Sequence, residues 1–537
     1  MTKTATNQRL SGDPFEPLDG PELVIALVGP VGADLELVCN VLTDELAKAQ
    51  YNSKEIRVST LLHQLEKYSH LSTTHDASEY ERIRNHMKSG TELRQIVERG
   101  DIMALLAVSE IRRQRQLENA EKHPEIEESE RPKIPLKRTA YILRSLKHPD
   151  EIGTLRHVYG RAFFVISVYS PRENRVDALA QLIARSRQKS DANSFRKEAE
   201  ELIGIDEAEE GNKLGQNVSD AFPLGDFFLD ARSKERIEQS VARFVDLLFG
   251  HPYHTPLKDE FAMFHAKSAA MRSADLSRQV GAVITTDDGD VIALGCNEVP
   301  KAGGGLYWCS DESDNRDFRR GHDSGARFKR NILAEVLRRL SDGNWLAEKK
   351  MERGVKALVD DLLTGESQGI LQDAHVTNLI EFGRAVHAEM AVLSDAARRG
   401  NAVKGGTLYT TTFPCHLCAR HIIAAGIKRV VYIEPYPKSL AKELYDDSLV
   451  IDPQYQVKNR VHFEPFVGIA PIRYMHFFEA KGKRKSPEGD VVDWDRGKSN
   501  PTLKRFVLSY IFIEDRVVGE VIPFELQSKN LVITGGQ

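Results

Sequence analysis

The chain has 537 residues, of which 41% are hydrophobic and 28% charged, and its formal net charge is −5 at pH 7. A chain of this length exceeds one ordinary hydrophobic core, so we expect two or more domains. The sequence has no apolar run long enough to span a bilayer, and its acidic balance provides no overall footprint for nucleic acid.

The N-terminal residues predict a polar lead, and the number of cysteines favours a cytoplasmic protein. Residues 1–20 contain Pro and Gly but no apolar segment of the signal-peptide type, so we expect a disordered lead. The chain has five cysteines, an odd number, which favours a reducing compartment over paired disulfides. The local basic runs at 112–115 and 481–485 are typical of a solvated surface.

Residues 21–250 alternate strands with helices, which predicts a parallel sheet covered by helices on both faces. The expected strands lie near 22–29, 56–58, 139–143 and 163–169, and the expected helices lie at 35–49, 78–118, 172–188 and 194–203. The pattern breaks near residue 250, where Gly and Pro cluster, and we expect the domain boundary there.

The turn at residues 29–34 resembles a phosphate-binding loop in its layout. A buried-type strand ends in Gly29, the turn contains Gly32, and a helix follows. The turn lacks the Lys and the Ser or Thr that contact phosphates and Mg²⁺ in such loops. Two interpretations stay open: a degenerate loop in which Gly29 and Gly32 help to bind a nucleotide, or a plain strand–turn–helix.

Residues 251–480 predict a second domain in which the helices and strands follow a different order. The expected order is helix, strand hairpin, helix, strand, helix, strand, with the hairpin turning at 287–290. A long charged insertion covers about 310–380. Residues 481–537 are expected to form a polar extension whose stretch 505–523 forms terminal strands.

Two short motifs in the second domain predict a catalytic metal site. His387 and Glu389 stand in V-H-A-E-M, and Cys415 and Cys418 stand in T-F-P-C-H-L-C. An H-x-E followed by P-C-x-x-C is the signature of zinc-dependent nucleoside and nucleobase deaminases. One His nitrogen and two thiolates would hold Zn²⁺ and leave a fourth position for water. Glu389 would then transfer protons between that water, the ring and the leaving ammonia.

The spacing of the motifs suits helix starts. Cys415 and Cys418 lie three apart, so both face one side of a first turn, with Pro414 expected at the first helical position. His387 and Glu389 are two apart and converge on one metal only near a helix start. A structural Cys₄ site is the alternative, but Cys39, Cys296 and Cys309 offer no second C-x-x-C.

Residues 257–447 resemble deoxycytidylate deaminases of the cytidine deaminase superfamily. The matching pieces are R-Q-V-G-A-V-I at 278–284, G-C-N-E-V-P at 295–300 and the two metal motifs. The resemblance implies an α/β/α sandwich for this domain. It also implies that Asn297 contacts the deoxyribose, although a turn role before Pro300 is the alternative.

The joined architecture resembles bacterial anti-phage deoxycytidylate deaminases. That resemblance implies an α/β protein with an N-terminal P-loop-kinase-like, parallel-sheet regulatory domain at 21–250 and a C-terminal cytidine-deaminase-like domain. It further implies dCMP or dCTP as substrate, a homo-oligomer and an inhibitory small RNA. Feedback by a regulatory nucleotide is the alternative form of control. The insertion before His387 is either a regulatory or lid element or a tolerated surface insertion.

The leading hypothesis is therefore zinc-dependent deamination of dCMP, dCTP or both to the uridine forms, which depletes the deoxycytidine nucleotide pool in anti-phage defence. One alternative is a housekeeping dCMP deaminase for dUMP supply. Another is a polynucleotide cytosine or adenosine deaminase, which would need a basic single-strand channel with aromatic side chains. A third is a zinc-site sensor without turnover, against which Glu389 argues.

Overall fold

The structure, a computed structural model, describes residues 20–533 with these exceptions: 72–77, 208–213, 348, 350–351, 365–368, 372–373, 375, 377–378, 437–438, 454, 456, 481–483 and 504–508. Nearly all of the expected polar lead lies outside the described residues. The chain divides into two compact units, one within Met1–Thr255 and Val467–Gln537, the other within Pro256–Phe466. Among the described helices, none combines the length and apolarity that crossing a bilayer requires.

The first unit contains a six-stranded sheet with the order β12-β5-β4-β1-β3-β2. Its strands are β1 (Leu23–Val28), β2 (Asn52–Arg57), β3 (Thr139–Leu146), β4 (Phe163–Tyr169), β5 (Phe227–Asp230) and β12 (Gly468–Ile469). All neighbours pair in parallel except β12, which is antiparallel to β5. β1 is buried throughout, as a central parallel strand covered on both faces requires. The predicted parallel sheet is confirmed.

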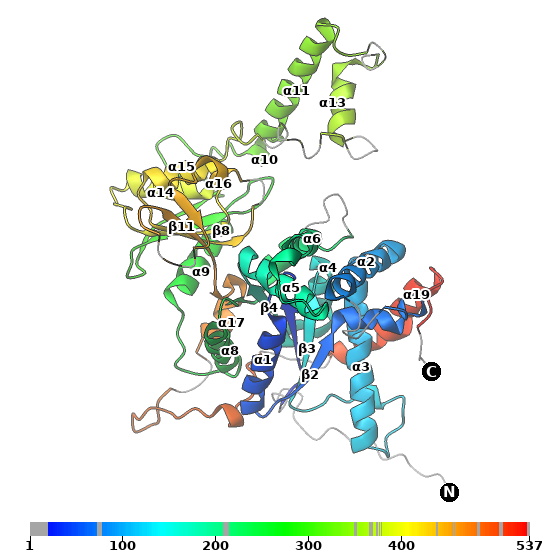
Figure 1. The fold of residues 1–537 in the computed structure, drawn as a ribbon. Coiled ribbons are helices and arrows are strands. Elements are labelled where there is room, and N and C mark those ends of the chain that lie inside the picture. The colour runs from blue at the N-terminus through cyan, green and yellow to red at the C-terminus, as the bar shows by residue number, and fades with distance from the viewer. Residues whose placement is uncertain are drawn as a thin grey trace. The chain divides into compact units, whose positions relative to one another are not determined.

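Helices cover both faces of this sheet (Figure 1). They are α1 (Leu35–Lys48), α2 (Glu79–Val97), α3 (Ile102–Lys122), α4 (Pro149–Tyr159), α5 (Arg172–Ser186), α6 (Arg196–Glu207), α7 (Val218–Ala221) and α8 (Lys234–Leu248). Val24 and Ala26 belong to one apolar cluster, whereas Leu23 and Ile25 belong to the other. Because neighbouring strand residues point to opposite faces, β1 separates two cores. The single helical stretch expected at 78–118 is two helices.

The carboxy-terminal residues return to the first unit. From Val467 onward they group with it, whereas the sequence analysis placed a separate extension after residue 480. The described part contains α17 (Tyr474–Phe478), α18 (Ser509–Arg516), a π-helical turn (Val517–Val521) and α19 (Ile522–Gln527). The strands expected at 505–523 are therefore wrong over 509–523, and residues 505–508 lie outside the described part of the chain.

The physical reason for these helices lies in what they bury. Tyr510, Val517, Ile522 and Leu526 join the core beside α3, at a spacing that only a helix brings to one face. Glu514 comes to the same side and pairs with the fully buried Arg115 at 2.6 Å. β-branched composition favoured strands, but tertiary burial decided the outcome.

The second unit contains its own six-stranded sheet with the order β10-β11-β9-β8-β6-β7. The strands are β6 (Gly281–Thr285), β7 (Val291–Cys296), β8 (Thr407–Thr412), β9 (Arg429–Glu434), β10 (Leu449–Ile451) and β11 (Val461–Pro465). β6 and β7 form the predicted antiparallel hairpin, and Gly289 supplies the positive φ of 94° that its turn needs. β8, β9, β11 and β10 pair in parallel.

Two helices pack on opposite faces of the hairpin. A Cβ on Gly281 would lie 1.9 Å from the Ala266 carbonyl of α9 (Lys258–Ala270), and one on Gly295 would lie 2.5 Å from the Val392 nitrogen of α14 (Ala388–Arg398). Gly281 pairs with Cys296, not with Gly295, so the two glycines face opposite sides. The unit therefore has helix, sheet and helix layers, with α15 (His416–Ala424) and α16 (Ala441–Leu444) beside α14 (Figure 1).

The charged insertion is largely helical where it is described. It contains α10 (Asp317–Arg320), α11 (Ser324–Asp342) and α13 (Gly354–Thr364). Leu333 and Leu337 of α11 pack against Val359 of α13 in a small apolar cluster of their own. The two helices thus form a hairpin that leads back to the His387 motif.

Candidate metal centre

Three metal-ligand side chains converge in the second unit. His387 Nδ1 lies 3.3 Å from Cys415 Sγ and 3.4 Å from Cys418 Sγ, and the three ligand atoms all lie within 4.8 Å of one another. Tetrahedral zinc with one nitrogen and two sulfur ligands requires N···S separations of roughly 3.5 Å. The donor set and its spacing therefore fit zinc, and three protein ligands leave a fourth position for a small molecule.

The ligands stand at two helix starts. His387 is the N-cap of α14 and Cys415 is the N-cap of α15, where the Cys418 amide donates to Cys415 Sγ at 3.5 Å. Unpaired N–H groups at a helix start favour a negative sulfur. The predicted position of His387 and Glu389 at a helix start is confirmed, and their convergence on one metal stays a prediction.

One detail of that prediction is wrong. Pro414 precedes the cap and is not the first helical residue, because Cys415 takes the capping position and α15 begins at His416. The Pro414 carbonyl instead accepts a hydrogen bond from Ser439 Oγ at 2.8 Å. The bond ties the metal-binding turn to the segment before α16.

Burial and hydrogen bonding act differently on the two thiols. Hydrogen bonds from Cys418 and from His387 lower the pKa of Cys415 to about 4. The hydrogen bond to Cys415, together with burial, raises the pKa of Cys418 well above its ordinary value. The two sulfurs lie within 4.8 Å of each other, and a divalent cation bound between them would displace the thiol protons.

The other cysteines do not join this centre. Burial raises the pKa of Cys39 to about 12 and that of Cys296 to about 11, as expected for inert core thiols. Cys309 is exposed. Among the described residues, His387, Cys415 and Cys418 form the one group of three or more His, Cys, Asp or Glu side chains close enough to hold an ion. A structural Cys₄ site is not formed there.

Glu389 lies beside the ligands without belonging to them. Its side chain is buried, its Oε2 lies 3.4 Å from Cys418 Sγ, and Thr410 Oγ1 donates to its Oε1 at 3.4 Å. Burial raises the pKa of Glu389, and the charge of Cys415 acts in the same direction. A carboxyl group in this position can hold a proton and release it near the open metal position.

A cavity of about 320 Å³ opens at the centre. It is lined by His387, Glu389 and Cys415 at one end and by Phe413, Tyr436, Arg278, Arg384 and Lys329 elsewhere. Aromatic side chains offer a flat apolar wall, and the cations offer partners for an anionic group. Sequence reasoning did not assign Phe413, Tyr436, Arg384 or Lys329 to the site. Phe413 and Arg384 each lie within three residues of a metal ligand along the chain, and this closeness in sequence could have indicated that they line the site.

Asn297 also lines this cavity, but the backbone occupies its side chain. Its Oδ1 accepts from the Val280 amide at 2.7 Å, and its Nδ2 donates to the Arg278 carbonyl at 2.8 Å. An amide group has further donor and acceptor capacity, so contact with a sugar stays a prediction. In the structure Asn297 holds the segment that carries Arg278 against the end of β7.

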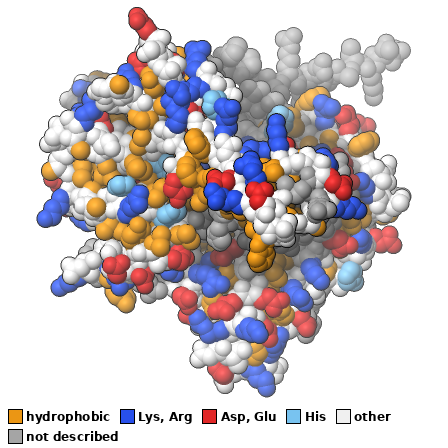
Figure 2. Space-filling view, turned by 90° about the horizontal axis from the view of Figure 1, so that it is seen from above, with side chains coloured by type: hydrophobic (Ala, Val, Ile, Leu, Met, Phe, Trp, Pro, Cys, Tyr) orange, Lys and Arg blue, Asp and Glu red, His pale blue; other side chains and the backbone are white. Residues whose placement is uncertain are grey.

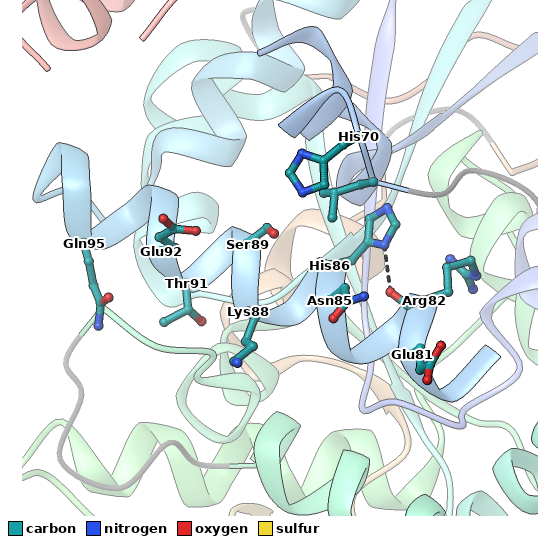
Figure 3. Close-up of a pocket in the computed structure, with 11 residues that line it drawn as sticks. His70, Glu81, Arg82, Asn85, His86, Lys88, Ser89, Thr91, Glu92 and Gln95 are labelled. Carbon is teal, nitrogen blue, oxygen red and sulfur yellow. Dashed lines mark hydrogen bonds between the residues drawn. The ribbon is translucent and has the colours of Figure 1, made fainter. Parts of the chain in front are cut away.

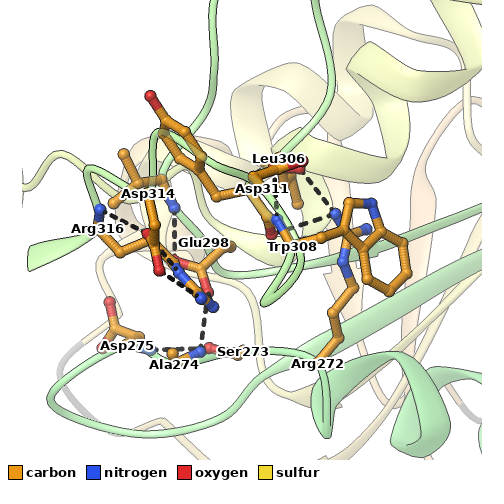
Figure 4. Close-up of polar contacts among 12 residues, drawn as sticks. Arg272, Ser273, Ala274, Asp275, Glu298, Leu306, Trp308, Asp311, Asp314 and Arg316 are labelled. Atoms are coloured by element: carbon orange, nitrogen blue, oxygen red, sulfur yellow. Dashed lines mark hydrogen bonds and ion pairs between the residues drawn. The ribbon is translucent and has the colours of Figure 1, made fainter. Parts of the chain in front are cut away.

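A network of polar side chains holds the loop that precedes Arg278, at the rim of the cavity (Figure 4). Glu298 is 1% exposed; it accepts from the Ala274 amide at 2.9 Å and from Arg316 Nη1 at 3.5 Å. Asp314 holds Arg316 through two hydrogen bonds of 2.9 and 2.7 Å, which raises the pKa of Arg316. Arg272 stacks over the Trp308 ring, 3.5 Å from its centroid. The start of the insertion is thereby tied to the loop that precedes Arg278.

Comparison with known proteins finds similarity in the part of the chain that contains this centre. Residues 256–434 match the family model described as the cytidine and deoxycytidylate deaminase zinc-binding region. Deoxycytidylate deaminase of Enterobacteria phage T2 is 44% identical over 64 residues, 12% of this chain and 33% of that protein. ComE operon protein 2 of Bacillus subtilis is 34% identical over 79 residues, 14% of this chain and 42% of that protein.

Longer but weaker similarity extends to an animal protein. Human deoxycytidylate deaminase is 25% identical over 174 residues, 32% of this chain and 63% of that protein. The chain spans about a third of the length of the phage relatives. The dCMP deaminase of cyanophage S-TIM5, whose crystal structure was solved with dCMP and dUMP, has 17% identity and a TM-score of 0.22. That match covers 40% of this chain and 100% of that one.

Proposed function

From a second unit that carries a cytidine and deoxycytidylate deaminase zinc-binding region, we propose that the protein is a hydrolase that deaminates deoxycytidine nucleotides. In this reaction water adds to C4 of the cytosine ring, the C4–N bond breaks, and uracil and ammonia form. Zinc held by His387, Cys415 and Cys418 supplies the Lewis acidity that makes water a nucleophile at neutral pH.

The observation that carries the proposal is the place of Glu389. Its carboxylate lies 3.4 Å from Cys418 Sγ, outside the ligand set, on the wall of the cavity. A carboxylate there would take a proton from the attacking water and give it to ring N3. It would then take the second proton from the hydroxyl at C4 and give it to the amino group, which leaves as ammonia. A zinc-site sensor would have no use for a buried carboxylate that is not a ligand.

The cavity supports a small phosphorylated substrate. Phe413 and Tyr436 can pack against the pyrimidine, and Arg278, Arg384 and Lys329 can pair with phosphate. The named phage relatives are deoxycytidylate deaminases, which supports dCMP. Figure 2 shows acidic and basic side chains interspersed over the face in view. The net charge of −5 favours free nucleotides over a nucleic-acid strand in a basic channel.

The finer proposal concerns biological role and control. We propose that dCTP is a substrate beside dCMP and that its loss starves an infecting phage of deoxycytidine nucleotides. The first unit would be a P-loop-kinase-like regulatory domain, which its parallel sheet and its strand–turn–helix at β1 support. Restraint would come from a small RNA or from a regulatory nucleotide, and the active form would be a homo-oligomer in the cytoplasm. The alternative role is housekeeping supply of dUMP.

The test is a direct assay of the purified full chain with dCMP, dCTP and single-stranded DNA oligonucleotides. Formation of dUMP or dUTP is expected. Uracil found in the oligonucleotides alone would favour the polynucleotide deaminase. Bound zinc with no product from any substrate would favour the sensor. Purification with and without nuclease, followed by the same assay, tests RNA restraint: equal activity and no bound RNA would favour nucleotide feedback.

A further inference from the structure

The first unit contains a cavity that no part of the deamination chemistry uses. It has a volume of about 230 Å³ and lies between the turn after β1 and helix α2. Five cationic side chains line it: Arg57, Arg82, Arg94, Arg144 and Lys147. Val58, Leu62, Met87 and Met103 form an apolar part of its wall. Charge and apolar surface together suit a ligand with an anionic end and a ring.

The turn itself already holds an internal anion. Asp206 of α6 is fully buried; its Oδ2 accepts from the Val31 amide at 2.5 Å, and its Oδ1 pairs with Lys147 Nζ at 2.8 Å. In ordinary phosphate-binding loops, a turn amide and a lysine bind the ligand's phosphate. Here a carboxylate takes that position, so the Val31 amide is not available to a ligand.

Close packing also explains why glycines occupy positions 29 and 32 of the turn. Gly32 has φ of 85°, and a Cβ there would lie 2.8 Å from the Arg175 carbonyl of α5. Gly32 lines the cavity, whereas Gly29 packs against Leu35 and Val168. The nucleotide contact predicted for Gly29 and Gly32 stays a prediction, and the cationic side chains offer the stronger attraction for an anion.

Two arginines, Arg94 and Arg57, line the cavity, and Arg94 has hydrogen-bond donors without a partner among the described residues. Arg94 is 3% exposed and donates through Nη2 to Glu151 at 2.7 Å, but its Nε and Nη1 have no partner in the part of the chain that is described. Burial and the nearby charges of Arg144 and Arg82 lower the pKa of Arg57. Buried guanidinium donors without acceptors are costly, so an anion that accepts from them would bind favourably.

We propose that this cavity binds the phosphate of a phosphorylated nucleoside through Arg57 and Arg94, with the nucleoside against the apolar wall. The Gln216 Oε1 in the wall is buried and without a hydrogen-bond partner among the described residues, so it can accept from a ring N–H. The inference gives the regulatory nucleotide of the proposed function a site and a ligand class.

A second cavity lies along α2 and shares two lining side chains with the first. Figure 3 shows this cavity, and Arg82 and His86 line both it and the first one. The His86 Nδ1–H donates to the Arg82 carbonyl at 2.8 Å, which orients the ring. Asn85 and Lys88 supply further polar groups to the second cavity.

Calorimetry on the full-length protein tests the inference, with dTMP, AMP and inorganic phosphate as probes because none of them carries a cytosine to deaminate. We expect at least one nucleotide to bind more tightly than inorganic phosphate. Arg57→Ala should weaken that binding about tenfold or more, since a charge-assisted hydrogen bond is lost. Arg57→Lys should recover part of the affinity. Arg113→Ala, an exposed arginine on α3 that pairs with Glu110, is the matched control and should bind normally.

Arg384→Ala in the second unit separates the two sites. Unchanged nucleotide affinity in this variant, together with weakened affinity in Arg57→Ala, supports the inference. Loss of binding in Arg384→Ala alone, unchanged binding in Arg57→Ala, or no binding by the unmodified chain at millimolar concentration would overturn it. Inorganic phosphate binding as tightly as the nucleotides would overturn the nucleoside part. Thermal unfolding checks that each variant folds, and a dCMP assay on the same samples reports separately on the deaminase proposal.

Discussion

The Sγ of Cys418 lies 3.4 Å from the Oε2 of Glu389, so a metal-ligand side chain directly contacts a carboxyl group that is outside the ligand set. Cys418 comes from the first turn of α15, and Glu389 comes from the first turn of α14. The two helix starts bring metal binding and proton transfer within one substrate's reach. The two functions can therefore be separated by substitution.

Glu389→Ala should keep zinc and lose turnover. The three ligands stay in place, while the loss of general acid–base catalysis lowers kcat by about 10²–10⁴-fold. Elemental analysis and a dCMP assay on the same sample measure both quantities. Glu443→Ala, an exposed glutamate on α16, is the matched control and should behave as the parent chain. Near-normal deamination with zinc bound would remove Glu389 from the mechanism.

Cys415→Ser should lose the metal as well as the activity. A serine hydroxyl is a far weaker zinc ligand than a thiolate, and Cys415 also caps α15. Zinc content after dialysis should fall well below one ion per chain. Cys309→Ser, which changes an exposed cysteine, should retain full zinc content. Full zinc content in Cys415→Ser would contradict the ligand assignment.

Arg316→Ala should impair catalysis without removing zinc. Loss of the Arg316 guanidinium leaves Glu298 buried without its ion-pair partner. This loosens the segment between Ala274 and Arg278 at the cavity rim. We expect kcat/KM to fall about tenfold, as misplacement of a binding group does. Arg319→Ala, whose side chain is 62% exposed and which also pairs with Asp314, is the control. An equal fall of kcat/KM in both variants would show that the effect of Arg316 does not act through Glu298.

Arg115→Met should destabilise the first unit. Arg115 is fully buried between Glu22 and Glu514, and Tyr510 donates to Glu22 at 2.8 Å. Removing one partner from a buried ion pair costs about 3–5 kcal/mol, because the remaining charges stay buried. The unfolding transition of the first unit and protease sensitivity of its carboxy-terminal helices measure the effect. A transition unchanged from that of the parent would contradict it.

The second unit should lose stability in acid through Asp259. Burial alone would raise the pKa of Asp259, but hydrogen bonds and charge from Arg429, with a hydrogen bond from Tyr409, hold it below its usual range. Because the folded-state pKa is lowered, the stabilisation is present above the unfolded value of about 3.9 and is lost as the pH falls below it.

Denaturant unfolding of the second unit between neutral pH and pH values below 4 measures this effect. Asp259→Asn should be less stable at neutral pH and should show a shallower fall in acid, since the titrating carboxylate is gone. Asp288→Asn changes an exposed aspartate in the hairpin turn and should follow the parent curve. Identical curves for Asp259→Asn and the parent would reject the assignment.

Local sequence patterns were enough to predict that His387, Cys415 and Cys418 come together, and to predict much of the two sheets, while the roles of these residues and of Glu389 stay predictions. His387, Cys415 and Cys418 occur in short motifs at helix starts, where capping geometry and ligand geometry coincide. The apolar run of β1 and the Gly289 turn also depend on neighbours only a few residues away. Such features can be predicted because their physical causes lie within one turn or one hairpin.

Contacts between distant residues decided the remainder. Asp206 reaches the Val31 amide across 175 positions, and Glu514 reaches Arg115 across 399. These partners show why the phosphate-loop layout already contains an anion, and why 509–523 is helical although strands were expected there. A buried charge must find an opposite charge or a hydrogen-bond partner wherever the fold provides one. No local pattern records which residue that will be, so only the tertiary structure could place these residues and the cavities beside them.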